Sequence, residues 1–278
     1  FMDKRLLTIQ DISCVGQCSL TVALPIISAC GIETAILPSS VLSNHTAKGY
    51  SGWTFCDLTD EMPKILERWQ KENIDFSAFY TGYVSKSQIP HILDIMEKTA
   101  RPNALKVVDP AMADNGKLYA GFDDDFPNEM KKLCAKADVL IPNLTEASLL
   151  LGVPYVASGY DKTYIEDLCR GLYGLGAKNV IITGVSFEAD KLGCVTFNGK
   201  DFEYYFTQKL DVAMHGTGDI YASVVVGALC RGKSLLEAAS LAADFVVESI
   251  KNTLGDDDHW YGAKFEKAIP YLVSRLEK

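Results

Sequence analysis

Apolar runs of strand length alternate along the chain with longer segments of helical periodicity. We expect seven strands, at Arg5–Gln10, Glu33–Leu37, Phe76–Thr81, Leu105–Asp109, Val139–Pro142, Asn179–Thr183 and Cys194–Phe197. Helical patterns lie between several of these runs, at Asp57–Lys71, Ser87–Thr99, Phe126–Lys136, Thr145–Leu151 and Tyr164–Tyr173. This alternation predicts an α/β fold in which a mostly parallel central sheet carries helices on both faces.

The pattern changes in the last third of the chain. Asn198-Gly199 is a strong hairpin signal, so we expect Asp201–Phe206 to pair with Cys194–Phe197. Three helices should follow, at Gly218–Cys230, Leu235–Asn252 and Tyr261–Leu276. The acidic run Asp256-Asp257-Asp258 is interpreted as a solvated loop between the last two helices.

The bulk composition suits a globular chain whose fold needs no disulfide or structural metal. Of its 278 residues, 48% are hydrophobic. We assign residues 1–278 to a single domain and set Phe1, which precedes Met2, aside as a cloning remnant. A core of that size requires neither disulfides nor a structural metal. The net charge of −9 argues against nucleic acid and anionic membranes as partners, because both attract basic patches.

The eight cysteines indicate a reducing compartment. They include no CxxC pair and are scattered through apolar segments, so they are interpreted as small buried side chains. The sequence shows neither a signal peptide nor an apolar run long enough to span a bilayer. The cytoplasm is therefore the expected location.

Polar side chains follow five of the predicted strands. These residues are Asp11, Thr81, Asp109, Asn143 and Thr183. In open parallel sheets, ligands bind beyond the carboxyl ends of the strands. We therefore expect a site along this edge, although loops are polar in most proteins.

The most informative motif is Gly216-Thr217-Gly218 followed by Asp219, at the start of an apolar helical run. Two glycines allow a tight turn whose amides approach a ligand closely. Those amides then lie at a helix N-terminus, which favours an anion. A carboxylate at this point suits a base that takes a proton from an alcohol attacking a phosphate. For the tetrapeptide alone, a plain helix entry with an acidic first turn stays open.

Two acidic groups each have a structural alternative. Asn143 and Glu146 have the spacing of a capping box. They could also stand at the metal and phosphate end of a site, acting through the waters that Mg²⁺ retains. Asp109 and Asp114 flank a loop with ordinary turn chemistry, or place a carboxylate near a cation.

Two other polar groups are equally ambiguous. Ser43-Asn44-His45-Thr46 could orient a polar ring or form a solvated turn, and His45 alone is expected to be a structural hydrogen-bonder. Asp11 and Ser13, at the end of the first strand, could bind a ring hydroxyl or a protonated ring nitrogen. Their alternative role is a cap on the next helix.

Taken together and in order, these motifs resemble the ribokinase-like superfamily and, within it, the pyridoxal (vitamin B6) kinases, from about Leu6 to about Leu254. The resemblance is carried by Ile9-Gln10, Ser43-Asn44-His45-Thr46, Thr81-Gly82-Tyr83, Asp109-Pro110 with Asp114, Pro142-Asn143 with Glu146, Thr183, and Gly216-Thr217-Gly218-Asp219. The sugar kinases of this superfamily usually have a glycine-rich first loop and an early lid sheet, which we do not find in this sequence. The resemblance implies a three-layer ribokinase-like α/β fold.

The resemblance also implies ATP-dependent phosphorylation of the 5′-hydroxymethyl group of pyridoxal, pyridoxine or pyridoxamine in vitamin B6 salvage. The implied roles are Asp219 as the base and Gly216, Thr217 and Gly218 as the anion hole. Asp109 and Glu146 would organise Mg²⁺, with K⁺ as a second candidate cation. Asn143, Thr183 and Gly218 would lie at ATP, and Asp11, Ser13, Thr46 and Tyr83 would lie around the vitamer. The segment Asp114–Phe122 would be a flap that excludes water. The family further implies a cytoplasmic homodimer whose small-molecule partners are the vitamer and ATP.

Two positions distinguish this chain within the family. Asp11 stands where pyridoxal kinases usually have Ser, which could change the preference among vitamers or admit a hydroxymethylpyrimidine. Asp219 stands where some bacterial relatives have Cys, so the base is retained. A hydroxymethylpyrimidine kinase of thiamine synthesis, a sugar or nucleoside kinase, and a non-catalytic vitamer-binding protein on the same fold remain as alternatives.

Overall fold

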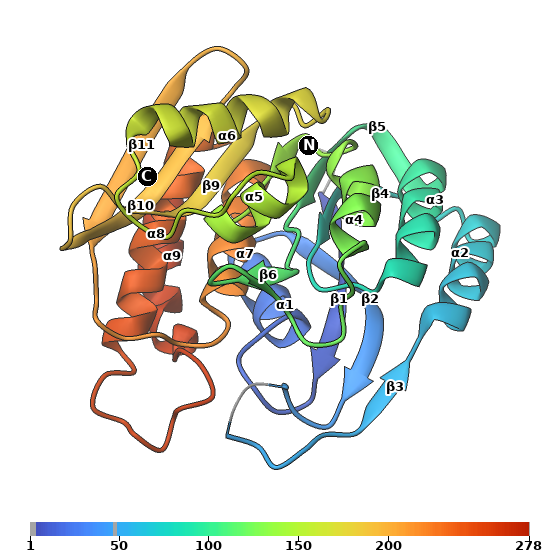
Figure 1. The fold of residues 1–278 in the computed structure, drawn as a ribbon. Coiled ribbons are helices and arrows are strands. Elements are labelled where there is room, and N and C mark those ends of the chain that lie inside the picture. Colours follow the sequence, from blue (N-terminus) through green and yellow to red (C-terminus); the bar gives the residue numbers. More distant parts are fainter. Residues whose placement is uncertain (1–3, 47–48, 278) are drawn as a thin grey trace.

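The structure, a computed structural model, describes residues 4–46 and 49–277, and a nine-stranded sheet runs through it (Figure 1). In spatial order the strands are β11 (Phe202–Gln208), β10 (Lys191–Phe197), β9 (Val180–Val185), β8 (Val139–Leu140), β5 (Ala100–Val108), β4 (Phe76–Thr81), β1 (Arg5–Ser13), β2 (Glu33–Leu42) and β3 (Phe55–Asp57). From β9 to β2 the neighbours pair in parallel, while β3, β10 and β11 pair antiparallel at the two sides. The predicted mostly parallel sheet and the predicted hairpin are both confirmed.

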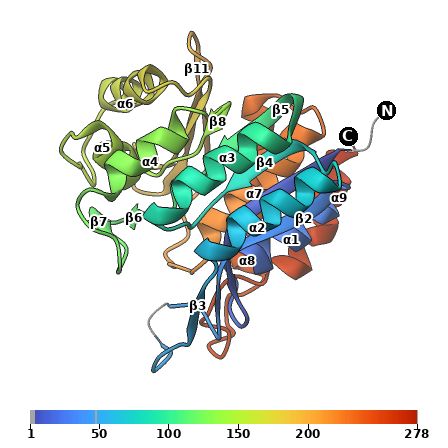
Figure 2. The same cartoon turned by 90° about the vertical axis from the view of Figure 1, so that its right-hand side faces the viewer.

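Helices cover both faces of this sheet (Figures 1 and 2). One layer contains α2 (Met62–Lys71), α3 (Ile89–Thr99), α4 (Phe126–Cys134), α5 (Leu144–Leu151) and α6 (Lys162–Gly174). The other layer contains α1 (Leu20–Ala29), α7 (Thr217–Cys230), α8 (Leu235–Lys251) and α9 (Ile269–Leu276). The predicted three-layer α/β architecture is therefore confirmed.

Each central strand contributes to two hydrophobic cores because successive side chains point to opposite faces of the sheet. Leu7 and Ile9 of β1 pack into the core under α2 to α6. Leu6 of β1 and Tyr80 of β4 pack into the core under α1, α7, α8 and α9. With both faces covered, the polar ends of the strands are left to form the site.

The sequence pattern gives no helix at Leu20–Ala29, where α1 lies. That segment is nearly all apolar and contains Pro25, so it lacks a polar face and carries a residue that disfavours helix interiors. Three other expected helices begin later than predicted, after the 3₁₀ turns Thr59–Glu61, Lys86–Gln88 and Phe265–Ala268. In each case a proline occupies the first turn of the true helix, where proline is tolerated.

The cysteines follow the prediction in part. Five of the eight are buried, namely Cys30, Cys134, Cys169, Cys194 and Cys230. Cys14 and Cys56 are exposed and Cys18 is half-buried, so the expectation of buried side chains is wrong for those three. They lie in the first loop and on the edge strand β3, away from the two cores. Within residues 4–46 and 49–277, no helix is long and apolar enough to cross a membrane.

The contact between α1 and α7 gives a test of core packing. A Cβ added at Gly227 of α7 would lie 2.4 Å from Sγ of Cys30, which is only 3% exposed. We expect Gly227→Ala to lower the free energy of unfolding by about 1–3 kcal/mol, as overpacking does. Gly174→Ala in α6 is the control, because nothing lies within 4 Å of its added Cβ. Urea unfolding measures both, and equal stability of the two variants would contradict the prediction.

Candidate active site

The N-terminus of α7 is built on a left-handed residue that only glycine suits. Gly216 has φ +75°, and a Cβ there would lie 1.7 Å from the backbone oxygen of Gln17. The turn brings the start of the 14-residue helix against the loop that follows β1. The amides of Thr217 and Gly218 thus lie at a helix N-terminus, where the dipole favours an anion.

Asp219 lies in the first turn of α7 and is held by a hydrogen bond from the segment between β1 and α1. The backbone N–H of Ser19 donates to its Oδ2 at 2.9 Å. Burial raises the pKa of Asp219 to about 6. The hydrogen bond from the Ser19 N–H lowers this pKa, and the negative charge of Asp11 raises it. A carboxylate with such a pKa is ionised at neutral pH and still basic enough to accept a proton.

Asp11 lies within β1 rather than after it, which corrects the predicted strand end. The register between β1 and β2 shifts between Gln10 and Ile12, so the strand continues past the irregularity to Ser13. Such irregularities re-aim side chains at sites. The Ser13 hydroxyl donates to Oδ2 of Asp11 at 3.2 Å, and burial raises the pKa of this carboxyl. The alternative role as a helix cap is wrong, since Ser19 is the N-cap residue of α1.

The expected vitamer residues fall into two places. Burial raises the pKa of Tyr83, and the charge of Asp11 adds to the rise, so these two side chains are neighbours. Cys18 belongs to the same group, since burial and then the charges of Asp219 and Asp11 raise its pKa to about 12. Thr46 is exposed in the loop after β2, and the two residues after it lie outside the described part of the chain.

Asn143 and Glu146 form the capping box that their spacing predicts. Asn143 Oδ1 accepts from the Glu146 N–H, and Glu146 Oε2 accepts from the Asn143 N–H, both at 2.9 Å. The other carboxylate oxygen of Glu146 accepts from the N–H groups of Met112 and Ala113. The structural role of the pair is thus confirmed, and a role toward a metal stays a prediction.

Asp109 directly follows β5 and forms a group of neighbouring carboxylates, the acidic group, with Glu146 and Asp219. Burial raises its pKa well above the usual range, and the charges of Glu146 and Asp219 raise it further. Burial likewise raises the pKa of Glu146 to about 7. One oxygen of Asp109 accepts from the Ala111 N–H at 3.0 Å. Carboxylates crowded in this way are stabilised by a cation or by protons.

The donor set fits Mg²⁺ held through water rather than by a protein cage. In the part of the chain that the structure describes, no group of three or more His, Cys, Asp or Glu side chains is placed to hold a metal ion directly. Mg²⁺ usually retains several waters and takes one or two carboxylates together with substrate phosphates. Asp109 and Glu146 offer carboxylate oxygens of the required kind.

Thr183, the last residue of the predicted strand, lies inside β9, which continues to Val185, and it is half-buried. Asn143 and Thr183 pair as an isolated parallel bridge, and the Thr183 N–H donates to the carbonyl of Pro142. The structure therefore brings these two expected ATP residues side by side at the same edge of the sheet. Asp114 lies at the end of β6 (Ala113–Asp114), where it pairs with Lys117 of β7 (Lys117–Leu118) in a short hairpin.

The segment expected to be a flap is this hairpin and the chain after it. Asn115 and Gly116 both have positive φ, which is the geometry of a two-residue hairpin turn. The Gly116 N–H donates to Oγ1 of Thr145, which ties the hairpin to α5. Burial and then the charges of Glu146 and Asp109 raise the pKa of Tyr119.

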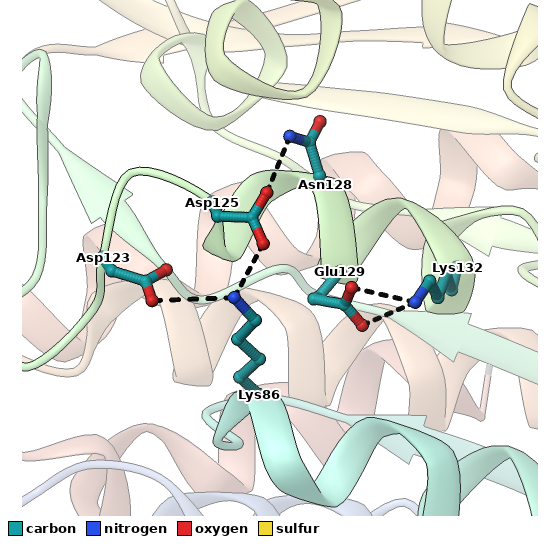
Figure 3. A network of polar contacts seen from close by, with 6 residues as sticks. All are labelled: Lys86, Asp123, Asp125, Asn128, Glu129 and Lys132. Atoms are coloured by element: carbon teal, nitrogen blue, oxygen red, sulfur yellow. Dashed lines mark hydrogen bonds and ion pairs between the residues drawn. The ribbon is translucent and has the colours of Figure 1, made fainter.

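The far end of the flap is attached near Tyr83. The rings of Tyr83 and Phe122 stack with centroids 5.1 Å apart. Just beyond them, Lys86 contacts the carboxylates of Asp123 and Asp125, at 3.6 and 2.7 Å (Figure 3). These exposed ion pairs contribute little energy. The stacked rings are therefore the main link between the flap and the expected vitamer side.

Sequence reasoning missed Ser19, Cys18 and the role of Tyr119. Ser19 acts through its backbone N–H, which carries no sequence signal, and its partner Asp219 lies 200 positions away. Cys18 was interpreted as an ordinary buried cysteine. Tyr119 was included in the flap without a role, although an aromatic residue inside a flap is a detectable signal.

Comparisons with known proteins identify the family. The model of the phosphomethylpyrimidine kinase family matches residues 62–261. The chain belongs to this family. A pyridoxal kinase from Dictyostelium discoideum is 29% identical over 245 residues, which cover 81% of this chain and 78% of that protein. A hydroxymethylpyrimidine/phosphomethylpyrimidine kinase from Aquifex aeolicus is 25% identical, covering 66% of this chain and 70% of that protein.

Solved structures agree in fold and in length. A candidate phosphomethylpyrimidine kinase from Bacteroides thetaiotaomicron is 39% identical, with a TM-score of 0.91 over 97% of this chain and 96% of that one. Pyridoxal kinase from Lactobacillus plantarum is 32% identical, with a TM-score of 0.89 over 98% and 97% of the two chains. The predicted resemblance to pyridoxal kinases of the ribokinase-like superfamily is thereby confirmed, as is the prediction of a kinase.

The raised pKa of Asp219 predicts a pH-dependent stability difference. Its carboxyl is more acidic in the unfolded chain, so stability is greatest when it is protonated and falls as the pH rises toward about 6. Asp219→Asn keeps an acceptor for the Ser19 N–H without the charge. We expect this variant to equal wild type near pH 4 and to exceed it by about 1–2 kcal/mol above pH 7, after allowance for partial exposure. Urea unfolding between pH 4 and 8 measures the difference, and a constant difference would contradict it.

Proposed function

We propose that this protein is an ATP-dependent kinase that phosphorylates the 5′-hydroxymethyl group of a vitamin B6 vitamer. The observation that carries the proposal is the Asp219 carboxylate, held by the Ser19 N–H in the first turn of α7 beside the amides of Thr217 and Gly218. A base and an anion site at one point match the needs of an alcohol that attacks a phosphoryl group. The curated relatives that carry pyridoxal kinase names support the choice of alcohol.

In this proposal Asp219 takes the proton from the substrate hydroxyl as the oxygen attacks the terminal phosphate of ATP. The amides of Gly216, Thr217 and Gly218 stabilise the charge of the transferring group. Asn143 and Thr183 contact the phosphates of ATP. Protein positioning supplies most of the catalysis in this chemistry, because little covalent work is left to the enzyme.

The acidic group beside Asp219 would serve the cation. Asp109 and Glu146 would hold Mg²⁺ through water, and the bound cation would neutralise phosphate charge. The flap carrying Tyr119 would close over the phosphates and exclude water, so that ATP is not simply hydrolysed. A requirement for K⁺ and a homodimeric state are further parts of the proposal that rest on the family resemblance. A cytoplasmic location is also proposed, and it rests on the cysteine pattern of the sequence.

The vitamer would lie on the side of Asp11 and Tyr83. Asp11 together with the Ser13 hydroxyl can accept from a ring hydroxyl or a protonated ring nitrogen. Tyr83 would contact the ring face, and Thr46 would approach from the loop after β2. The relative from Bacteroides thetaiotaomicron, which was solved in a form with pyridoxal, supports a vitamer as the ligand.

Hydroxymethylpyrimidine is the second candidate substrate. The name of the family and the relative from Aquifex aeolicus favour it. Both substrates carry a hydroxymethyl group on a flat nitrogen ring, so the same base and anion site would serve. A sugar or nucleoside kinase and a non-catalytic binder are less favoured, because the curated relatives named above are vitamer or pyrimidine kinases and a binder has no use for a base.

The proposal is tested by ATP-dependent phosphorylation of pyridoxal, pyridoxine, pyridoxamine, hydroxymethylpyrimidine and ribose, with Mg²⁺ and with or without K⁺. We expect turnover on the vitamers well above the other two. Turnover on the pyrimidine or ribose alone would keep the chemistry and replace the substrate. Vitamer binding without turnover would favour the non-catalytic alternative.

Removal of the base has a defined consequence. We expect Asp219→Ala to lower kcat about a hundredfold or more, which is what a general base contributes, with a much smaller change in KM for ATP. Steady-state kinetics with pyridoxal measures this effect. Asp244→Ala is the control, because this acidic residue lies on α8 and its carboxylate accepts from Tyr205 outside the site. Turnover of Asp219→Ala close to wild type would remove Asp219 from the role.

Asp11 should decide the ranking of the vitamers. Asp11→Ser restores the residue usual in pyridoxal kinases and removes a charge beside the expected ring site. We expect the relative kcat/KM for pyridoxal, pyridoxine and pyridoxamine to change by about tenfold or more, since a charged hydrogen bond is worth roughly 1.5–3 kcal/mol. Competition assays with the three vitamers measure it. An unchanged ranking would place Asp11 away from the ring.

A further inference from the structure

Four aromatic rings join three loops beside the anion-hole motif. This aromatic cluster consists of His45 and Tyr50 from the loop after β2, His215 directly before Gly216, and Trp260 from the loop after α8. The rings of Tyr50 and Trp260 have centroids 4.8 Å apart. His45 lies at the centre, 5.2 Å from Tyr50, 5.5 Å from His215 and 6.2 Å from Trp260. It is only 4% exposed although it lies in a loop.

One backbone carbonyl in the loop after α8 binds both the loop after β2 and the loop after β1. The oxygen of Tyr261 accepts from Nε2 of His45 at 3.1 Å and from the N–H of Gln17 at 3.4 Å. A carbonyl can only accept, so Nε2 of His45 carries the hydrogen. His45 precedes Thr46, the expected vitamer residue, while the loop of Gln17 continues to Ser19, which holds Asp219.

Three glycines allow these loops to pack closely against one another. A Cβ at Gly16 would lie 2.2 Å from the His45 ring, one at Gly49 would lie 2.4 Å from the Trp260 ring, and one at Gly262 would lie 2.3 Å from Cβ of Gln17. All three glycines have φ values between +130° and +155°, a region that other residues rarely adopt. The loops therefore fit together in one arrangement that larger residues would disrupt.

We propose that His45 and Trp260 are positioning residues for the alcohol substrate. The segment Asp256–Gly262 acts as a clamp that fixes the loop bearing Thr46 against the loop that supports Asp219. Because the clamp holds His45, the direct neighbour of the expected vitamer residue Thr46, it sets the KM for the alcohol and leaves the KM for ATP unchanged. This inference rests on the proposed function, because it takes the alcohol to lie beside Thr46.

The test compares disruptive with conservative variants. Trp260→Ala removes the ring contacts and His45→Leu removes the hydrogen bond, and each should raise the KM for pyridoxal about five- to tenfold, the value of roughly one lost contact. The KM for ATP should stay within about twofold. Trp260→Phe keeps a ring and His45→Gln keeps an N–H donor, so both should return the KM to within about threefold of wild type.

A matched control is available in the same region. Trp53→Ala removes an exposed tryptophan from the chain leading into β3, outside the aromatic cluster, and should leave both KM values unchanged. Thermal melts check folding. If Trp260→Ala does not fold, the comparison of His45→Leu with His45→Gln decides. Equal rises in the KM for pyridoxal and for ATP, no rise at all, or no recovery in the conservative variants would overturn the clamp.

Failure of the clamp is separable from failure of the proposed function. Wild-type turnover on the substrate panel is recorded first. If wild type phosphorylates hydroxymethylpyrimidine or ribose instead, the same ratios of KM are taken on that alcohol. If it binds pyridoxal without turnover, the dissociation constant replaces KM. In each case the clamp is supported if the variants selectively weaken binding of the alcohol, and it is overturned if they do not.

Discussion

The site depends on one close approach between the loop after β1 and the residue that precedes α7. Gly216 can meet the carbonyl of Gln17 only because it has no side chain, and the turn it makes starts α7 beside the first loop. The Ser19 N–H then reaches the Asp219 carboxylate. The proposed base and the amides of the proposed anion hole are therefore held by the same contact, since both belong to the first turn of α7. A shift of that turn would displace both of them together.

The second constraint is electrostatic. The chain has a net charge of −9, yet it is proposed to bind a polyphosphate. The local field resolves the conflict, because a helix N-terminus supplies positive potential where the phosphoryl group would lie. The nearby carboxylates of Asp109 and Glu146 have raised pKa values, chiefly because they are buried, and for Asp109 also because Glu146 and Asp219 carry like charges. Such a group gains most from a bound cation, so metal and nucleotide are expected to bind cooperatively.

Much of the fold and of the site could be predicted because the signals are local. Strand ends such as Asp109 and Asn143 follow apolar runs, and the capping box of Asn143 and Glu146 can be read from four residues. What could not be predicted is either irregular or long-range. The bulge at Asp11 interrupts no sequence pattern, and α1 has no polar face to mark it. The Ser19 contact to Asp219 joins residues 200 positions apart through a backbone group.

The capping box also shows that a structural and a functional role need not exclude each other. Glu146 accepts three backbone N–H groups, two at Oε1 and one at Oε2. An ionised carboxylate has about four acceptor positions, so roughly one remains. That is too little for direct, multidentate coordination of a metal, but it is enough for one water. The same bonds fix the carboxylate rigidly and lower its pKa against the effect of burial. In the proposed function, the cap would hold Glu146 ready to accept a hydrogen bond from a metal-bound water.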